Sequence, residues 1–382
     1  MPDFVENGPE VSFIEHRTIE DIRDGLTADF ESYMTETAGQ PVRLERSSVY
    51  RMILYAAAAQ LYQAMQYVDR AGKQNLLKYS YGPFLDNLAL LKGVTRLPAA
   101  KASATLRFTL SAPRSGAVGI PAGTRVSDGG TVFFATEAYA EIPPGSLTAE
   151  VRGVCTVSGL AGNGFQPGTL RVLVDPIPYT AAVENLTLTE GGADEESDAD
   201  LAERVFLAPS AYSTAGPADS YRYHARAYSP AVGDVAVTGD QAAGRVNVAF
   251  LLADGSAPGP DMLAGMEAYL RDGGIRPMTD LVTVSAPERV PYRLDLTYYI
   301  NRSDSGRALG IQTAVQGAAE DYVRWQRTIG RDVNPSKLLS MVVAAGAKRA
   351  EIAAPAFVRV DAASVAELEG EPVLRYGGLE DD

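Results

Sequence analysis

The sequence is poor in the residues that most enzymes use for chemistry. Its 382 residues include one cysteine and two histidines. A single cysteine excludes an intrachain disulfide framework and is typical of a chain that folds in a reducing cytoplasm. Neither His16 nor His224 lies beside a nucleophile motif, so we expect both to pack locally or to lie at the surface. We therefore predict no catalytic residue, no metal ligand and no cofactor.

The lone cysteine has the surroundings of a buried hydrophobic residue. Apolar and more polar residues alternate around Cys155 in LTAEVRGVCTV, residues 147–157. A period of two is that of a half-buried strand, so we expect the thiol to pack in a core. A nucleophilic thiol is the alternative.

Basic residues and long apolar runs are scarce as well. The 48 acidic residues outnumber the 34 basic ones, and the formal net charge is -14. Nucleic-acid affinity comes from clustered Lys and Arg, so this balance argues against a nucleic-acid partner. The nearest basic group, Arg43, Arg46 and Arg51, fits a solvated helix face. No basic leader precedes an apolar run and no run approaches 18 apolar residues, so we expect neither a secretory signal nor a membrane span.

The length and the changing pattern predict a multidomain α+β protein. The chain exceeds the roughly 250 to 300 residues at which a single hydrophobic core stops growing. We place an N-terminal helical region at 1–98 and a β-rich middle domain at 99–190. Two mixed α/β subdomains follow, at 191–288 and at 289–382. The second ends in an acidic tail, LEGEPVLRYGGLEDD, which we expect to be mobile or ordered by a partner.

Two helices are predicted at the start of the N-terminal region. Thr18 and Asp21 make a capping-box start, and apolar residues follow at helical spacing up to Gly39. A longer helical pattern from about Arg43 to Tyr79 carries apolar residues on two faces. Such a helix packs on two sides, so we expect it to join a bundle with another chain. Its predicted partner-interface residues are Tyr50, Ile53, Leu54, Leu61 and Tyr67.

The C-terminal domain supplies the other predicted interface residues. A helix from about Gly306 to Gln326 carries the lone tryptophan near its end, and a second helix spans 335–345. Aromatic side chains in such positions pack in a core or at an interface. We assign Tyr322, Trp325, Leu338 and Leu339 to a partner interface.

Two motifs invite a ligand but are better explained by structure. GLAGNG at 159–164 lacks the lysine of a phosphate-binding loop, so we expect a turn. In ADEESDADLAERV, Ser197 is expected to be an N-cap, with Asp198 and Asp200 at the positive end of a helix dipole. A calcium loop is the alternative, because acids alternate there. The central glycine and terminal glutamate of an EF-hand are missing.

The 191–288 region has a clear order of helices and strands. From Pro217 the pattern predicts a helix to about Tyr228 and strands near 234–238 and 245–253. A helix at 260–272 and a strand at 281–286 follow. The link between the first two strands, GDQAAG, has the length of a hairpin, and the later helix supplies a crossover.

Five segments, in this order along the chain, resemble the baseplate J-like family, the wedge proteins of contractile phage tails and related injection machines. The segments are IPAGTRV at 120–126, GLAGNGFQPG at 159–168, GGADEESDADLAERV at 191–205, STAGP at 213–217 and RPMTDLVTV at 276–284. The resemblance runs from about Leu85 to Pro287 and more weakly to Pro355. No single segment decides it, and the order carries it.

The resemblance implies a structural, non-enzymatic wedge subunit. Such a subunit packs in a ring around the tail tube and holds the sheath closed until the tail is triggered. The implied partners are other copies of the chain, a tail protein I-like wedge partner, an inactive lysozyme-like wedge protein, the baseplate hub and the sheath. The implied location is the baseplate of a virion or tailocin particle, made in the bacterial cytoplasm. A tail-associated glycan hydrolase and a β-rich adhesin are the alternatives.

Overall fold

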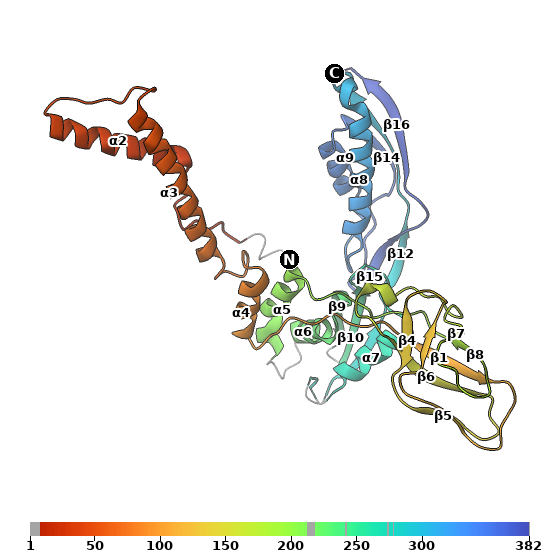
Figure 1. Ribbon diagram of the computed structural model, residues 1–382. Coiled ribbons are helices and arrows are strands. Elements are labelled where there is room, and N and C mark those ends of the chain that lie inside the picture. Colours follow the sequence, from red (N-terminus) through yellow and green to blue (C-terminus); the bar gives the residue numbers. More distant parts are fainter. Residues whose placement is uncertain (1–7, 212–217, 241–242, 273–274, 278, 382) are drawn as a thin grey trace. The chain divides into compact units, whose positions relative to one another are not determined.

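The computed structural model divides the chain into two compact units (Figure 1). It describes residues 8–211, 218–240, 243–272, 275–277 and 279–381. The first unit contains Met1–Arg96 and Ser197–Phe206, and the second contains Leu97–Glu196 and Leu207–Asp382. The first is built from helices and the second from sheets with helices packed on them. This confirms the multidomain α+β class.

The first helix of the first unit is α2 (Ile19–Ala38), which begins at the predicted capping box. The Asp21 N–H donates to Thr18 Oγ1 at 3.1 Å, and the Thr18 N–H donates to the Asp21 carboxylate at 2.8 Å. Gly39 ends the helix in the left-handed region with φ 67°. A residue with a Cβ would be strained there, which explains why the helix stops at this glycine.

The second helix, α3 (Val49–Lys73), begins later than the sequence predicts. The Glu31 carboxylate of α2 accepts hydrogen bonds from the Leu44 N–H at 2.8 Å and from Arg43 at 2.6 Å. These contacts hold the residues before α3 in a non-helical link. The Leu44 N–H thus bonds to a carboxylate of α2 and not to a carbonyl of α3, so this link lies outside the helix.

Two further segments pack in the first unit. The segment 8–17 lies along the C-terminal half of α3, where the Phe13 N–H donates to Asp69 at 2.8 Å. The Phe13 ring fills the space beside Gly72, since a Cβ on Gly72 would lie 2.6 Å from it. Helix α4 (Gly82–Leu90) is the second of these segments, and it ends before the turn at Gly93.

The β-rich domain is a strongly curved sheet of six strands in the order β7-β3-β4-β6-β1-β8. The outer strands β7 and β8 lie beside each other, so the sheet curls toward closure. Strands β2 and β5 form a separate two-stranded sheet. The strands are β1 (Ser103–Leu110), β2 (Val118–Ile120), β3 (Arg125–Ser127), β4 (Phe133–Thr136), β5 (Ala140–Ile142), β6 (Thr148–Cys155), β7 (Val172–Leu173) and β8 (Thr180–Asn185).

Strand β1 alternates between buried and partly exposed residues, as a half-buried strand does. Leu106, Phe108 and Leu110 are buried, and the residues between them are partly exposed. The Cys155 thiol is buried in the same core, as expected from its alternating surroundings. Phe134 is buried there as well and meets Phe165 edge to face at 5.9 Å.

The next domain has the predicted order of elements. These are α6 (Ala218–Tyr228), β9 (Val232–Asp240), β10 (Arg245–Leu252), α7 (Pro260–Leu270) and β11 (Leu281–Ser285). Strand β10 pairs antiparallel with β9 and parallel with β11, and α7 forms the crossover. Residues 241 and 242 of the predicted hairpin link lie outside the described residues, as does the STAGP segment at 213–217.

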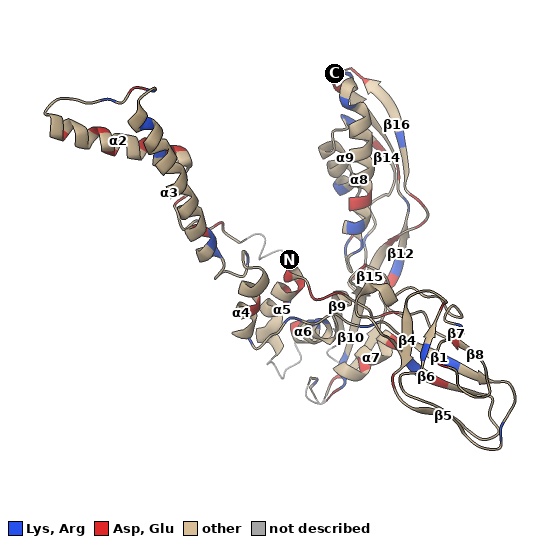
Figure 2. Cartoon of the chain, viewed as in Figure 1, with Lys and Arg blue, Asp and Glu red and all other residues tan. Residues whose placement is uncertain are grey.

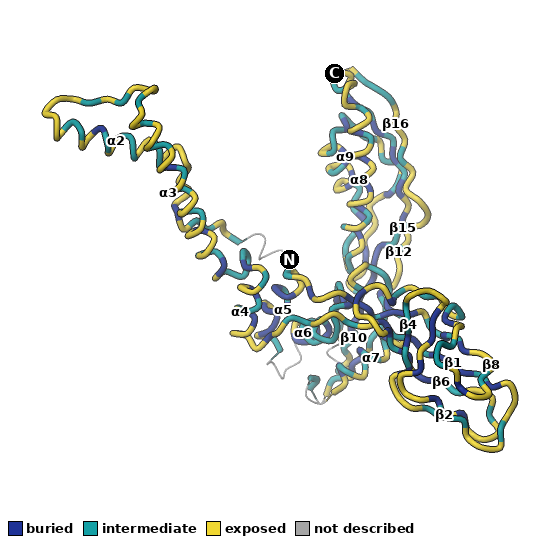
Figure 3. Tube along the Cα trace, viewed as in Figure 1, coloured by how far each residue is buried: buried dark blue, intermediate teal, exposed yellow. Residues whose placement is uncertain are grey.

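The C-terminal domain packs two helices on a three-stranded sheet ordered β14-β13-β16. A second pair, β12 and β15, is parallel. The elements are β12 (Glu288–Tyr292), β13 (Asp295–Asn301), η2 (Arg302–Arg307), α8 (Ala308–Gln326), α9 (Pro335–Ala344), β14 (Arg349–Ala354), β15 (Ser364–Leu368) and β16 (Val373–Glu380). Both helices contribute buried side chains to one core. The buried residues are dark blue along the trace in Figure 3.

The expectation of a mobile acidic tail is wrong. Residues 373–380 form β16, which pairs parallel with the central strand β13. Leu374 and Leu379 pack against the domain core, and Arg349 donates from Nε to Glu380 at 2.8 Å. Two apolar anchors and an ion pair hold this segment in spite of its acidic composition. The residue boundaries of the four predicted domains stay predictions.

Candidate functional site

Helix α3 exposes a long apolar face. Its large exposed apolar side chains are Val49, Tyr50, Met52, Ile53, Leu61, Tyr67 and Val68. Within the described residues of α2 and α3, the one apolar side chain that is buried is Ala58. In Figure 3 the trace of α3 is mostly yellow and teal, the colours of exposed and partly buried residues. Apolar surface of this extent marks an interaction site in soluble proteins.

Part of this face has the spacing of a helix–helix seam. We define the α3 stripe as Tyr50, Leu54, Ala57, Leu61, Ala64, Val68 and Ala71. The steps alternate between four and three residues, which keeps the side chains on one side of the helix. No charged residue occurs between Arg51 and Asp69. The stripe is therefore suited to contact another apolar helix along its whole length.

Four of the five residues predicted for an interface on this helix are exposed. Tyr50, Ile53 and Tyr67 are each 59% exposed and Leu61 is 47% exposed. Leu54 is half-buried. The Tyr50 ring stacks on Phe30 of α2 at 5.6 Å, so one edge of the stripe adjoins α2. Their contact with another chain stays a prediction.

The C-terminal set is divided between core and surface. Tyr322 and Leu338 are fully buried in the core of their own domain, which corrects their assignment to a partner-contacting surface. Burial raises the pKa of Tyr322 to about 12. Its hydroxyl donates to the Asn334 carbonyl at 3.3 Å. Trp325 is half-buried with Arg331 over its ring at 4.3 Å, and Leu339 is 38% exposed. Trp325 and Leu339 stay candidates for a partner interface.

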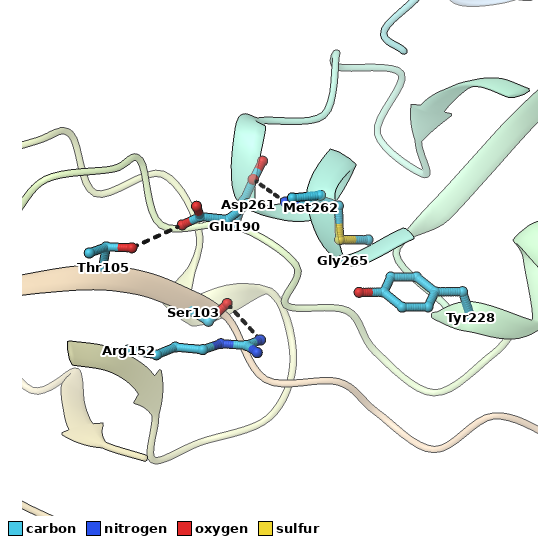
Figure 4. A pocket seen from close by; sticks show the side chains of 9 residues that line it. Ser103, Thr105, Arg152, Glu190, Tyr228, Asp261, Met262 and Gly265 are labelled. Atoms are coloured by element: carbon cyan, nitrogen blue, oxygen red, sulfur yellow. Dashed lines mark hydrogen bonds between the residues drawn. The ribbon is translucent and has the colours of Figure 1, made fainter. Parts of the chain in front are cut away.

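A cavity of about 390 Å³ lies where the β-rich domain meets α7 (Figure 4). Its acidic groups bind protein atoms: Glu190 accepts from the Gly259 N–H at 2.6 Å, and Asp261 accepts from Thr187 Oγ1 at 3.1 Å. Arg152 donates to Ser103 Oγ at 3.3 Å. Sequence reasoning missed Glu190. The available signal was the Gly259–Pro260 start of α7, which lacks a capping side chain of its own.

Comparison with known proteins identifies both middle domains. Residues 105–192 match the Baseplate J-like protein barrel domain, and residues 213–286 match the Baseplate J-like central domain. The chain belongs to the baseplate J-like family. It is 28% identical over 224 residues to Baseplate protein J of Escherichia phage P2. The matched region covers 57% of this chain and 71% of that protein.

A solved structure is similar along most of this baseplate J-like chain. It is titled the cryo-EM structure of the anti-feeding prophage (AFP) baseplate, 6-fold symmetrised. The sequences are 13% identical, and the match covers 96% of this chain and 97% of that chain at a TM-score of 0.37.

The glycine-rich segment of this baseplate J-like chain forms a structural turn, as predicted. Leu160–Gly162 is a short 3-10 helix, and the Asn163 side chain both donates to and accepts from the Gly192 backbone at 2.8 and 2.9 Å. The following loop is held by the buried Asn185 amide, which donates to the Gln166 carbonyl and accepts from the Leu170 N–H. The motif therefore positions its own loop.

The acidic segment of the family resemblance begins a helix, α5 (Asp198–Ala211). The Asp200 N–H donates to Ser197 Oγ at 3.2 Å, so Ser197 is the predicted cap. Asp198 accepts from Arg96 at 2.6 Å, and Glu196 accepts from the Leu97 N–H at 2.9 Å. Among the residues that the structure describes, no group of three or more His, Cys, Asp or Glu side chains is arranged to hold a metal ion.

The histidines and the arginine group make local contacts. The His16 N–H donates to Ser12 Oγ at 3.0 Å, and His224 lies against Tyr223 in α6, where burial lowers its pKa. Arg43 binds Glu31, and Arg51 donates to the Tyr55 hydroxyl at 2.6 Å.

Within the described part of this baseplate J-like chain, no helix has the length and apolar composition needed to cross a membrane.

Proposed function

We propose that this chain is a structural subunit of a contractile-tail baseplate. The main support for this proposal is that the barrel and central domains of the baseplate J-like family follow each other in one chain. Similarity to 71% of a phage baseplate protein J supports the same location. In this proposal the subunit acts as a wedge in the ring around the tail tube and transmits the trigger for sheath contraction.

The exposed face of α3 supports a role in assembly. An uncharged helix face that lies open in a single chain costs free energy in water, and contact with another protein removes that cost. The proposed partners are further copies of the chain, a tail protein I-like wedge partner, an inactive lysozyme-like wedge protein, the hub and the sheath. The particle is a virion, a tailocin or another contractile injection system, assembled in the bacterial cytoplasm.

A closed ring needs two different contact surfaces on each subunit, because its members meet head to tail. We assign one surface to α3 and the other to the C-terminal domain near Trp325 and Leu339. This division gives each end of the chain a separate task. It also predicts that damage to either end leaves incomplete rings.

The test is incorporation into particles. A Leu61→Asp/Val68→Asp double variant places two charges on α3, and we expect it to be absent from purified particles that contain sheath and tube. Leu147→Asp/Val157→Asp is the matched control, because its residues are 45% and 57% exposed against 47% and 60% in the test pair. Normal incorporation of the test variant would contradict the proposal. Peptidoglycan turnover by the purified chain would favour the hydrolase alternative.

A further inference from the structure

We infer that a small cavity between the central domain and the C-terminal domain binds an oxyanion, a carboxylate or a phosphate group, through Arg289 and Arg327. The inference goes beyond the proposed function, because both arginines lie outside the two matched family domains. Three features support it: a cavity with a partly apolar lining, two arginines that line it, and the absence, among the described residues, of an acidic partner for Arg327.

The cavity lies within the second unit and has a volume of about 210 Å³. One side is the loop after β10, and the other is formed by β12, β15 and the C-terminal end of α8. The apolar part of the lining includes Leu251, Val365 and Ala366, which are buried. The volume is below the roughly 300 to 1,000 Å³ of pockets for drug-sized ligands, so the cavity suits a small group.

Arg327 reaches this cavity from the C-terminal end of α8 and contacts the central domain. A Cβ on Gly255 would lie 3.2 Å from the Arg327 Cδ and 3.8 Å from its Nη1. Gly255 has φ 80°, a conformation that favours glycine, so this residue both makes the turn and leaves room for the arginine. The side chain of Arg327 is therefore packed against the loop that forms the opposite side of the cavity.

This arginine has no acidic partner within salt-bridge distance among the residues that the structure describes. The acids near it in the chain and in the loop bind other groups. Asp321 pairs with Arg324 at 2.5 Å, and Asp254 accepts from the Ser256 N–H at 2.8 Å. Acidic residues, red in Figure 2, are spread along the chain and outnumber the basic ones by 48 to 34. The charge of Arg327 is thus left for an added anion.

Arg289 of β12 lines the same cavity and is only loosely paired. Its Nη1 lies 3.2 Å from the Glu367 carboxylate, and the two side chains are 64% and 36% exposed. An ion pair this exposed contributes little to stability, so Arg289 is free to turn toward a ligand. A guanidinium has five N–H donors, and one carboxylate does not use all of them.

The charge and the donors of the lining select an oxyanion. Two guanidiniums and one carboxylate give the lining a net charge of +1. The planar N–H fork of arginine matches the paired oxygens of carboxylate and phosphate groups. Buried apolar residues beside the fork lower the local dielectric, which strengthens its attraction to an anion relative to open surface. A cation would instead be repelled.

Two sources supply such a group with the same chemistry: an acidic segment of a partner chain, and free phosphate. Calorimetric titration of the isolated full-length chain with inorganic phosphate, and with a short blocked glutamate peptide, distinguishes them. At about 0.15 M salt, which screens unspecific attraction, we expect one saturable site. Saturation by the peptide alone would identify a protein carboxylate, and saturation by phosphate a free anion. Absence of saturation with both ligands would overturn the inference.

Variants of Arg327 test the assignment to this cavity. Arg327→Gln should weaken binding about tenfold or more, because charge-assisted hydrogen bonds are lost. Arg327→Lys keeps the charge but not the planar fork, so we expect a smaller loss. The matched control is Arg324→Gln, which makes the same charge change on the same helix at a side chain that is 76% exposed. It should bind as wild type does, and an equal loss in both glutamine variants would show a general charge effect and contradict the assignment.

Arg289→Gln provides a second test of the same cavity and should also weaken binding. Unchanged binding in both Arg289→Gln and Arg327→Gln would place any bound anion elsewhere and refute the inference. Melting curves check that the variants stay folded, and we expect no change because both side chains are exposed. Failure of this site leaves the proposed function intact, since the titration uses the isolated chain and the proposed function is tested by incorporation into particles.

Discussion

The Glu190 carboxylate of the barrel domain accepts a hydrogen bond from the Gly259 N–H of the central domain at 2.6 Å. Gly259 is the N-cap of α7 and has no side chain to cap the helix, and Pro260 supplies no N–H. The second Glu190 oxygen accepts from the Met262 N–H at 3.4 Å. A residue 69 positions earlier in the chain thus performs the work of a helix cap and joins the two domains.

Replacing Glu190 by alanine should destabilise the second unit. Loss of a capping carboxylate costs about 0.5–2 kcal/mol, and here it also leaves the start of α7 without a partner. The measurement is urea unfolding of the purified chain, with hydrogen exchange at Gly259 and Met262. Glu150→Ala, an exposed glutamate of β6, is the control and should change stability by under about 0.5 kcal/mol.

The raised pKa of Glu190 predicts that the stability of the folded chain depends on pH. Burial is the main cause that raises the Glu190 pKa above 4.5, and it outweighs the two N–H contacts, which lower the pKa. A carboxyl whose pKa is raised by folding favours the folded state most below its unfolded pKa. That contribution is lost as pH rises through the folded pKa. We expect wild type to lose stability relative to Glu190→Gln as pH rises from 4.5, in paired denaturation curves. Parallel curves would contradict this.

A methyl group at Gly259 should also break the junction. A Cβ there would lie 2.4 Å from the Glu190 carboxylate, so Gly259→Ala must displace the cap. We expect a loss of about 1–3 kcal/mol in the free energy of unfolding. Gly310→Ala is the control, because its Cβ would meet nothing within 4 Å in α8, and it should stabilise by about 0.5–1 kcal/mol. Equal effects of the two changes would refute the steric argument.

Removal of the last strand should unfold the C-terminal domain locally. A chain ending at Pro372 lacks β16, so β13 loses its parallel partner and the core loses Leu374 and Leu379. Large apolar side chains removed from a core cost about 2–5 kcal/mol each, so we expect a lower melting temperature and fast hydrogen exchange in β13. A chain lacking only Asp381 and Asp382 keeps the strand and serves as the comparison. Unchanged melting of the shorter chain would restore the interpretation as a mobile tail.

Several local features could be predicted from neighbouring residues alone. The Thr18–Asp21 box, the alternation of β1 and the Ser197 cap depend on side chains within about four positions of the backbone groups they serve. The apolar pattern of α3 likewise predicted a helix with two packing faces. The order of the family motifs, read along the chain, predicted the family that the two domain matches show.

Other features depended on residues that are distant in sequence, and only the tertiary structure decided them. Glu31 binds Leu44 and delays the start of α3, Glu190 caps α7, and β16 pairs with β13 across the domain. Tyr322 and Trp325 follow one helical pattern, yet the position of the sheet buries one and leaves the other half-exposed. Periodicity shows that a side chain has an apolar neighbour, but it does not show whether that neighbour belongs to the same chain. Burial is set by where the other elements pack, and no local spacing contains that information.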